Sequence, residues 1–466
     1  MNLQAPILAG AAQVSDSDEA LVLMAAAARA AASDADAPDL LGAIDAVIIP
    51  RGTWPYADPG RALARELGSP DARTILTELG ISQQGLINEA LELVAGGGAE
   101  VALVVGGESR RFERNGDYSG APGTPDINLT WPPDIIDDVE LEAGMVFPAV
   151  RPYAAIERAF SHGQGLDDAG AAVEIGALWE AMNKVAQTNP IAAFATPRTA
   201  KELSTPSSSN PILAAPYLRW HASQWTVDQA AALLITTVGA ARRFGVDPAR
   251  VLHPHVAIES THVMPLIRRA ELGRWPAMAV LGAAAEAWLG YPLRSMDVTE
   301  IYSCFPAAVR VQAAELAIDL DPAPTVTGGM AFAGGPFNNF VFHATSSVAD
   351  ELRRNPGSFG LVTTVSGLLT KPGLAVWSTV PPKEGALIAD LAEEAAAATA
   401  TLDVDPAPTG PVRIETATAF VDNDVPIAAY IGRTTEGRRA LIRIEGEAAY
   451  DEAVASASIG ESIQAS

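Results

Sequence analysis

The chain has 466 residues, of which 48% are apolar and 19% charged, the balance of a folded globular protein. This length exceeds what one simple core holds, so we expect about two to four domains. The net charge of −25 excludes a broad electrostatic attraction to nucleic acid or to an anionic membrane. The single cysteine excludes an internal disulfide and a cysteine-rich metal site.

The amino-terminal sequence lacks the charged and then apolar pattern of a signal segment, and no apolar run reaches about 18 residues. We therefore expect a cytoplasmic protein without a membrane partner. The 39 glycines and 34 prolines are spread along the chain, which indicates many tight turns rather than disorder.

The first part of the chain alternates between apolar strands and helices. Strands are expected at 7–12, 46–49 and 101–105, and helices at 19–32 and 86–95. This alternation predicts an α/β sheet.

Residues 110–215 have a different character, because polar, Pro-rich and aromatic pieces follow one another without strand alternation. We expect an excursion that packs on the α/β unit over a site. In 227–244, apolar residues recur at helical spacing, which predicts a helix there.

The second half repeats the plan of the first. A strand is expected at 255–259, a helix at 276–289, a helix from Pro336 after a Gly-rich turn, and a strand at 359–365. VALVVGGES and GLVTTVSG both end an apolar strand in glycine, which is consistent with an internal duplication.

The last part of the chain predicts a separate small module. An Ala/Glu-rich helix and a Pro-rich linker are expected within 381–410. Between 412 and 445 apolar and polar positions alternate, with turns at 422–423 and 435–437, which predicts a partly open β-barrel.

The only cysteine stands where a strand is expected to end and a helix to begin. Val298 and Ile301 indicate the strand, and Pro306 suits a first helical turn. The free N–H groups of such a helix start favour a thiolate, so Cys304 is a candidate for chemistry. The alternative is a buried cysteine in an ordinary turn.

A second candidate is the Gly-rich run TVTGGMAFAGGPFNNFVFHAT. Its glycines let a ligand approach the backbone, and Asn338 and Asn339 can donate hydrogen bonds from a first helical turn. His343 follows Asn339 by one turn and faces the same side. The alternative is a structural turn beside a helix that carries a histidine.

Two further groups carry polar side chains at strands. His253, His255, Glu259 and His262 fit no standard zinc spacing, so we expect structural or substrate-lining roles and no metal. In VSGLLTK, the turn after a strand, a lysine is placed where it could meet a phosphate.

Four motifs together resemble those of the thiolase superfamily, namely the GGES strand end, the YSCF junction, the GG…GGP run and SGLLTKPG. The resemblance is closest to its sterol-carrier-protein-type, thiolase-like branch, in the acetyl-CoA acetyltransferase group. It spans residues 5–380, and the tail resembles the additional carboxyl-terminal β domain of the type 1 proteins.

This resemblance implies two βαβαβαββ halves in a five-layered αβαβα body. The halves would be 1–250, with a loop domain at about 110–215, and 251–380. A helix and linker at 381–410 and an OB-like β domain at 411–466 would follow. The implied ligand is a CoA thioester of lipid metabolism with no further cofactor, and a homodimer or a partner acyl-CoA-binding protein is expected.

The catalytic positions of the family are replaced in this chain. Working thiolases carry their nucleophilic cysteine near 80–82, where this chain reads LGISQQGL. The family's oxyanion-hole histidine becomes Tyr302, its GHP histidine becomes Gly335, and its last Cys-Gly pair becomes Ser366-Gly367. Acyl transfer through a cysteine near residue 80 is therefore not expected, and the resemblance places Cys304 at a different family position, as a pocket-lining residue.

The resemblance then assigns candidate roles. The catalytic candidates are Tyr302, Cys304 and His343, and the CoA-binding candidate is Lys371. The oxyanion or substrate-pocket candidates are Gly335, Asn338, Asn339, Ser366 and Gly367. Two functions stay open. The first is an enzyme, either a divergent acyl-CoA acyltransferase or a retro-aldol carbon–carbon lyase that uses Tyr302 as acid and base. The second is a catalytically silent acyl-CoA-binding or scaffold protein.

Overall fold

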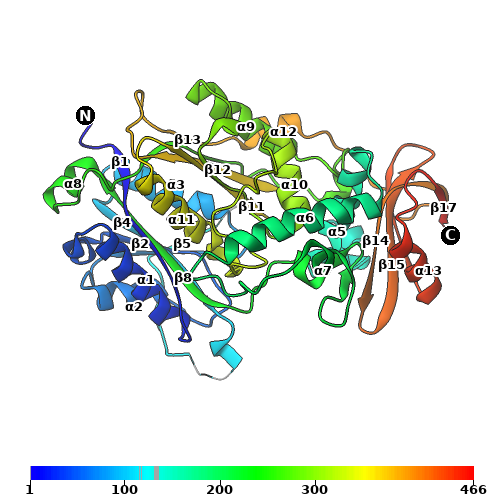
Figure 1. Ribbon diagram of the computed structural model, residues 1–466, viewed down its shortest axis with the longest axis horizontal. Coiled ribbons are helices and arrows are strands. Elements are labelled where there is room, and N and C mark those ends of the chain that lie inside the picture. Colours follow the sequence, from blue (N-terminus) through cyan, green and yellow to red (C-terminus); the bar gives the residue numbers. More distant parts are fainter. Residues whose placement is uncertain (1, 115, 117, 131–135, 466) are drawn as a thin grey trace.

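The computed structural model describes residues 2–114, 116, 118–130 and 136–465 of the chain. An α/β body carries an antiparallel sheet at its carboxyl-terminal end, drawn in orange and red in Figure 1. Two sheets lie in the body, and helices α3 (Gln83–Ala95) and α11 (Phe340–Arg354) contact both of them. Further helices cover the outer face of each sheet, which gives the expected five layers.

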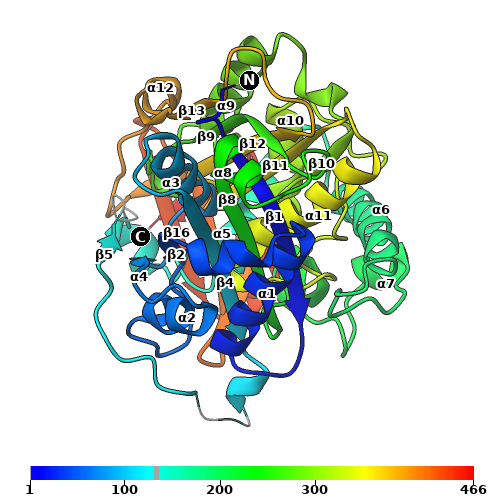
Figure 2. The same cartoon turned by 90° about the vertical axis from the view of Figure 1, so that its left-hand side faces the viewer.

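The first sheet has the strand order β1-β8-β4-β2-β3-β5. Strand β8 pairs antiparallel with both β1 and β4, whereas the pairs from β4 to β5 are parallel. Its strands are β1 (Pro6–Ser15), β2 (Ala46–Ile49), β3 (Arg73–Thr77), β4 (Val101–Ser109), β5 (Ile127–Leu129) and β8 (Asp228–Thr237). Helices α1 (Ala20–Asp34) and α2 (Pro59–Leu67) cover its outer face (Figure 2).

Strand β8 corrects the prediction of a helix over 227–244. Every residue of β8 is buried, since the strand lies between β1 and β4 and helices cover both faces of the sheet. A central strand of this kind is apolar without alternation, so helical spacing can be found in it by chance. A helix, α8 (Val238–Arg243), forms only at the end of the segment.

The second sheet has the order β10-β11-β12-β9-β13. Its strands are β9 (His253–Glu259), β10 (Val298–Glu300), β11 (Phe359–Ser366), β12 (Lys371–Ser378) and β13 (Leu387–Asp390). The predicted helix at 276–289 is confirmed as α9 (Pro276–Leu289), which packs on β12 and β9. The expected Ala/Glu-rich helix is short, α12 (Ala392–Ala398), because β13 precedes it.

The excursion at 110–215 carries helices joined by long irregular segments. It holds α4 (Asp138–Glu142), α5 (Val150–Gly163), α6 (Asp168–Ala186) and α7 (Ala200–Ser204). Among the described residues, no helix of the chain is both long and apolar enough to cross a membrane.

The carboxyl-terminal module is built on a third sheet, with the order β16-β15-β14-β6-β7 and β17 paired to β14. Its strands are β6 (Ile212–Ala214), β7 (Tyr217–Leu218), β14 (Gly410–Asp422), β15 (Val425–Thr434), β16 (Arg439–Glu445) and β17 (Ser462–Ala465). The alternation and both turns are confirmed. The described strands form a sheet that ends at β16 and β7, so closure into the expected partly open barrel stays a prediction.

The module is fastened to the body by buried polar contacts. One strand of its sheet, β6, comes from the excursion, and β7 follows directly after the excursion. Helix α13 (Glu447–Ala455) packs on β14 and β15. The fully buried side chain of Arg158 in α5 donates to the carbonyls of Ala417 at 3.2 Å and of Ala453 at 2.7 Å. The module and α5 therefore share a buried interface.

Candidate functional site

A cavity of about 500 Å³ lies where several loops of the body meet, and we call it the junction cavity. Its walls come from the turn before α3, the segment from α4 to α5, the loop before α9, the β10–α10 junction, the turn just before α11 and the β11–β12 turn. Apolar side chains dominate these walls. Four of them are well exposed to solvent and so mark the mouth, namely Leu79, Ile136, Phe147 and Phe337.

Five of the nine residues predicted from the sequence line the junction cavity, namely Tyr302, Cys304, Asn338, Ser366 and Gly367. They come from three separate motifs, so the structure brings together segments that the sequence could only propose one at a time. The described lining does not include the other four candidates, Gly335, Asn339, His343 and Lys371.

Cys304 lies between β10 and helix α10 (Pro306–Glu315), and Pro306 takes the first helical position as predicted. Burial nevertheless raises the pKa of its thiol to about 12, and the hydrogen bonds that favour the thiolate offset only part of this shift. The expected thiolate is therefore wrong, and Cys304 carries a neutral thiol at neutral pH.

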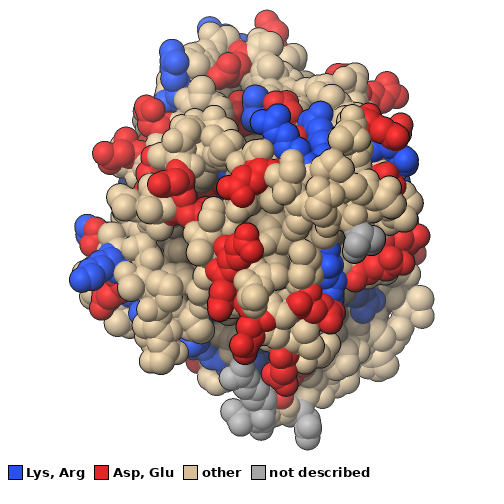
Figure 3. All heavy atoms as spheres, turned by 90° about the vertical axis from the view of Figure 1, so that its right-hand side faces the viewer, with Lys and Arg blue, Asp and Glu red and all other residues tan. Residues whose placement is uncertain are grey.

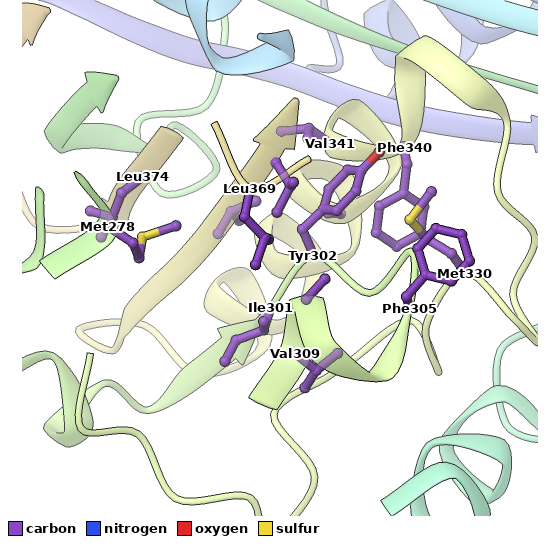
Figure 4. Close-up of a cluster of buried hydrophobic side chains, with 14 of the residues drawn as sticks. Met278, Ile301, Tyr302, Phe305, Val309, Met330, Phe340, Val341, Leu369 and Leu374 are labelled. Carbon is purple, nitrogen blue, oxygen red and sulfur yellow. The ribbon is translucent and has the colours of Figure 1, made fainter. Parts of the chain in front are cut away.

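Tyr302 is 7% exposed, and its ring meets Phe340 edge-on with 5.7 Å between ring centroids (Figure 4). Its N–H donates to Thr363 Oγ1 at 2.9 Å, and its hydroxyl is hydrogen-bonded to Gln83 of α3. Burial raises the pKa of the phenol well above its ordinary value. The site thus holds a fixed, protonated hydroxyl.

Tyr153 of α5 is a second phenol in the cavity that the sequence did not single out. Its hydroxyl donates to the carbonyl of Gly367 at 3.0 Å and is hydrogen-bonded to the Cys304 thiol. Its ring stacks on Phe305, with centroids 4.5 Å apart. The only sequence signal was its place in an aromatic and Pro-rich piece, RPYAAIER.

Glu140 of α4 is the one residue with a charged type of side chain (Asp, Glu, Lys or Arg) among the described residues that line the cavity. It is 4% exposed, and its Oε1 accepts from the N–H of Ile267 at 2.7 Å. Burial raises the pKa of this carboxyl, while the N–H bond and nearby Arg269 oppose the shift. A carboxyl with a raised pKa is suited to accept a proton near neutral pH. No sequence motif pointed to it.

The turn before α3 is held by two of the predicted residues. Ser366 Oγ and Lys371 Nζ both donate to the carbonyl of Gly80 at 2.6 Å. Lys371 is 2% exposed, so its expected contact with a CoA phosphate stays a prediction that this burial does not favour. Ser82, which stands near the family's cysteine position, is buried beside Glu259 rather than in the described lining of the cavity.

His343 is not brought to the junction cavity. Its Nε2 lies 2.8 Å from Asn339 Oδ1 and its Nδ1 lies 3.1 Å from Gln13 Oε1, and burial lowers its pKa to about 3. Gly335 is packed so tightly that a Cβ there would lie 1.8 Å from Ser223 Oγ. His343, Asn339 and Gly335 therefore lie outside the described lining of the cavity, and their predicted roles stay predictions.

The histidine-rich strand β9 also has packing roles. His255 Nε2 lies 2.8 Å from the carbonyl of Val380, and burial lowers the pKa of both His253 and His255. Glu259 Oε1 accepts from Asn88 at 3.4 Å, and burial raises the pKa of Glu259 to about 8. Among the described residues, no cluster of three or more His, Cys, Asp or Glu side chains could hold a metal.

A scan against protein-family models and a search of curated proteins found no match. A search of solved structures found a monomeric SCP2-thiolase like protein type 1 from Mycobacterium smegmatis, with a TM-score of 0.87 and 27% identity. The match covers 100% of this chain and 97% of that chain, so it includes the carboxyl-terminal module. This match along the whole chain supports the assignment to the SCP2-like branch of the thiolase superfamily.

More distant structures share the fold of this thiolase-like protein. The Ltp2-ChsH2(DUF35) aldolase matches with a TM-score of 0.60 and 20% identity, over 81% of this chain and 98% of that chain. Human mitochondrial 3-ketoacyl-CoA thiolase matches with a TM-score of 0.55 and 17% identity, over 81% and 99%. Both leave about a fifth of this chain uncovered, in contrast to the type 1 protein.

Proposed function

We propose that this thiolase-like protein acts on an acyl-CoA thioester as a carbon–carbon lyase of the retro-aldol kind, without a covalent acyl-enzyme. The observation that carries the proposal is the protonated hydroxyl of Tyr302, fixed in an apolar cavity at the family's oxyanion-hole position. A thiolate nucleophile has no support there, because Cys304 keeps its proton at neutral pH. The likeness to an aldolase in fold is consistent with this reaction class.

The proposed step needs one base and one hydrogen-bond donor. Glu140 takes the proton of a 3-hydroxyl group, the bond between carbons 2 and 3 breaks, and a ketone or aldehyde leaves. The electron pair forms the enolate of the shortened thioester, which Tyr302 stabilises by donating to its oxygen. The proton returns from Glu140 to carbon 2, so the atoms balance and no further reagent is needed.

The acyl group and the nucleotide of the ligand would occupy different surroundings. No basic side chain lines the described part of the cavity, which suits an apolar acyl group and not a phosphate. We place the acyl group inside and the phosphates of CoA outside the mouth.

A second candidate is a silent acyl-CoA-binding protein. It is favoured by the neutral state of Tyr153, Tyr302 and Cys304, which leaves Glu140 as the single base candidate in the described lining. Such a site can bind an apolar acyl group by burial alone.

The test is incubation of the full chain with 3-hydroxyacyl-CoAs of increasing apolar bulk, followed by detection of the carbonyl product and the shortened acyl-CoA. Turnover should fall at least about 100-fold in Tyr302→Phe, the size expected for a lost donor to the enolate oxygen. Tyr450→Phe, in the distant helix α13, is the matched control and should keep full turnover.

Calorimetric titration with the same compounds separates the two candidates. Saturable binding without any turnover would contradict the lyase and support the silent binder. Absence of both would contradict the assignment of an acyl-CoA ligand.

A further inference from the structure

Three arginines stand side by side across the carboxyl-terminal sheet. In the antiparallel register, Arg413 of β14 lies opposite Arg433 of β15, and Arg433 lies opposite Arg439 of β16. Directly opposite residues project from the same face of a sheet, and like charges in such pairs repel each other. This arginine row therefore requires negative charge nearby.

One carboxylate supplies part of that charge. Glu415 accepts from Arg433 Nε at 2.6 Å and also forms an ion pair with Arg439, which is fully buried. Arg439 also donates to the carbonyls of Arg269 and Ala270. Within the part of the chain that the structure describes, the side chain of Arg413 has no hydrogen bond or ion pair.

Arg413 and Arg433 line a cleft of about 690 Å³ between the sheet and the body, which we call the arginine cleft. The end of α5 forms a second wall, with His162 and Gln164, and the segment before α9 forms a third. The described lining of the cleft shares no residue with that of the junction cavity. The two are therefore separate sites.

The charged groups around the cleft do not balance. Arg274 lines it and is held by Glu315, with Arg274 Nε 2.7 Å from Glu315 Oε1, and Glu271 lies close to Arg274. The guanidinium groups of Arg274 and the arginine row thus outnumber the carboxylates of Glu271, Glu315 and Glu415 by one, and Arg413 is the excess. This excess of positive charge is local, because the chain as a whole has a net charge of −25.

The surrounding surface makes this excess distinct. The face at the carboxyl-terminal end of the molecule carries many scattered carboxylates, while several basic side chains gather in one group (Figure 3). A small anion with several charges would gain most from a recess in which guanidinium groups converge, because guanidinium binds phosphate oxygens through paired hydrogen bonds.

We propose that the arginine cleft binds a phosphate-bearing small molecule, with its phosphate between Arg413 and Arg433. The cleft volume is in the range of small-molecule sites, which is larger than a lone phosphate needs. The ligand class is thus a phosphorylated compound of about nucleotide size, with His162 and Gln164 as further hydrogen-bonding groups. The proposal does not depend on the reaction proposed for the junction cavity.

The test is calorimetric titration of the full chain with inorganic phosphate, pyrophosphate and ADP at low salt. We expect saturable binding of pyrophosphate or ADP that weakens about tenfold in Arg413→Ala, the loss of one charge-assisted contact. Arg413→Glu should abolish binding, and added salt should weaken it. Arg294→Ala, at an exposed position in the loop before β10, is the matched control and should bind like the wild type.

Two outcomes overturn the proposal. One is the absence of saturable binding of any of the three probes at millimolar concentration. The other is binding that Arg413→Ala and Arg413→Glu leave unchanged. Because the side chain of Arg413 is exposed and has no hydrogen bond or ion pair with described residues, both variants should fold, which unchanged circular dichroism would verify.

Discussion

The junction cavity and the arginine cleft share helix α5, with Tyr153 lining the first and His162 the second, yet they keep their ionisable groups in different states. In the cavity, burial without a counter-ion leaves Cys304 and Tyr302 neutral. Beside the cleft, burial lowers the pKa of Arg439, but the ion pair with Glu415 opposes that shift. The difference teaches that a partner, and not depth alone, decides whether a buried group stays charged.

The largest expected effect concerns Glu259, a buried carboxyl of β9 beside Asn88. Its pKa is about 8 in the folded chain against 4.5 as the reference, so the folded state holds a proton that the unfolded state releases. Stability should therefore fall as pH rises from about 4.5 toward 8, by roughly 1.4 kcal/mol per pH unit. Urea unfolding of the wild type and Glu259→Gln across this range measures the difference.

Glu259→Gln should remove the contribution of Glu259, so its free energy of unfolding should rise relative to that of the wild type as pH increases, while Glu436→Gln at an exposed turn should follow the wild type. Equal pH profiles for the wild type and Glu259→Gln would contradict the assigned protonation state. In that case Glu259 would be charged in the folded chain despite its burial.

The next effect concerns the opposite case, a charge kept by its partner. Glu415→Ala should destabilise the fold by about 3 kcal/mol, because it leaves the buried guanidinium of Arg439 without its carboxylate. The free energy of unfolding in urea is the measurement, and Glu445→Ala at the exposed end of β16 is the control. A change below about 1 kcal/mol would show that backbone carbonyls suffice for Arg439.

The smallest effect is expected at the cysteine. Cys304→Ser should leave turnover or ligand affinity within about threefold, because a neutral thiol is replaced by a neutral hydroxyl of similar shape. Alkylation by iodoacetamide at neutral pH should be slow and should rise with pH. Fast alkylation at pH 7 would mean a thiolate and would reverse the interpretation of the cavity.

The homodimer implied by the resemblance stays a prediction. The outer edge of β3 is paired with β5, and Asp126 accepts from the N–H of Thr74 at 2.8 Å, so this edge is not open to a second copy. Light scattering of the purified chain would determine its oligomeric state.

The sequence by itself determined the features that depend on neighbouring residues. The helix from Pro276, the strand end and helix start around Cys304, and the paired turns of the last module were all predicted correctly, since caps, prolines and local periodicity act over a few residues. The family resemblance also rested on short motifs. These included the set that meets at the junction cavity.

Only the tertiary structure decided what depends on distant segments. Strand β8 is extended because it pairs with β1 and β4, which are far away in the chain. Its apolar run was therefore mistaken for a helix. Tyr153 and Glu140 enter the cavity through the packing of α4 and α5, and the arginine row exists only in the register of three strands. Burial on both faces, cavity walls and cross-strand register are long-range properties, which local pattern does not contain.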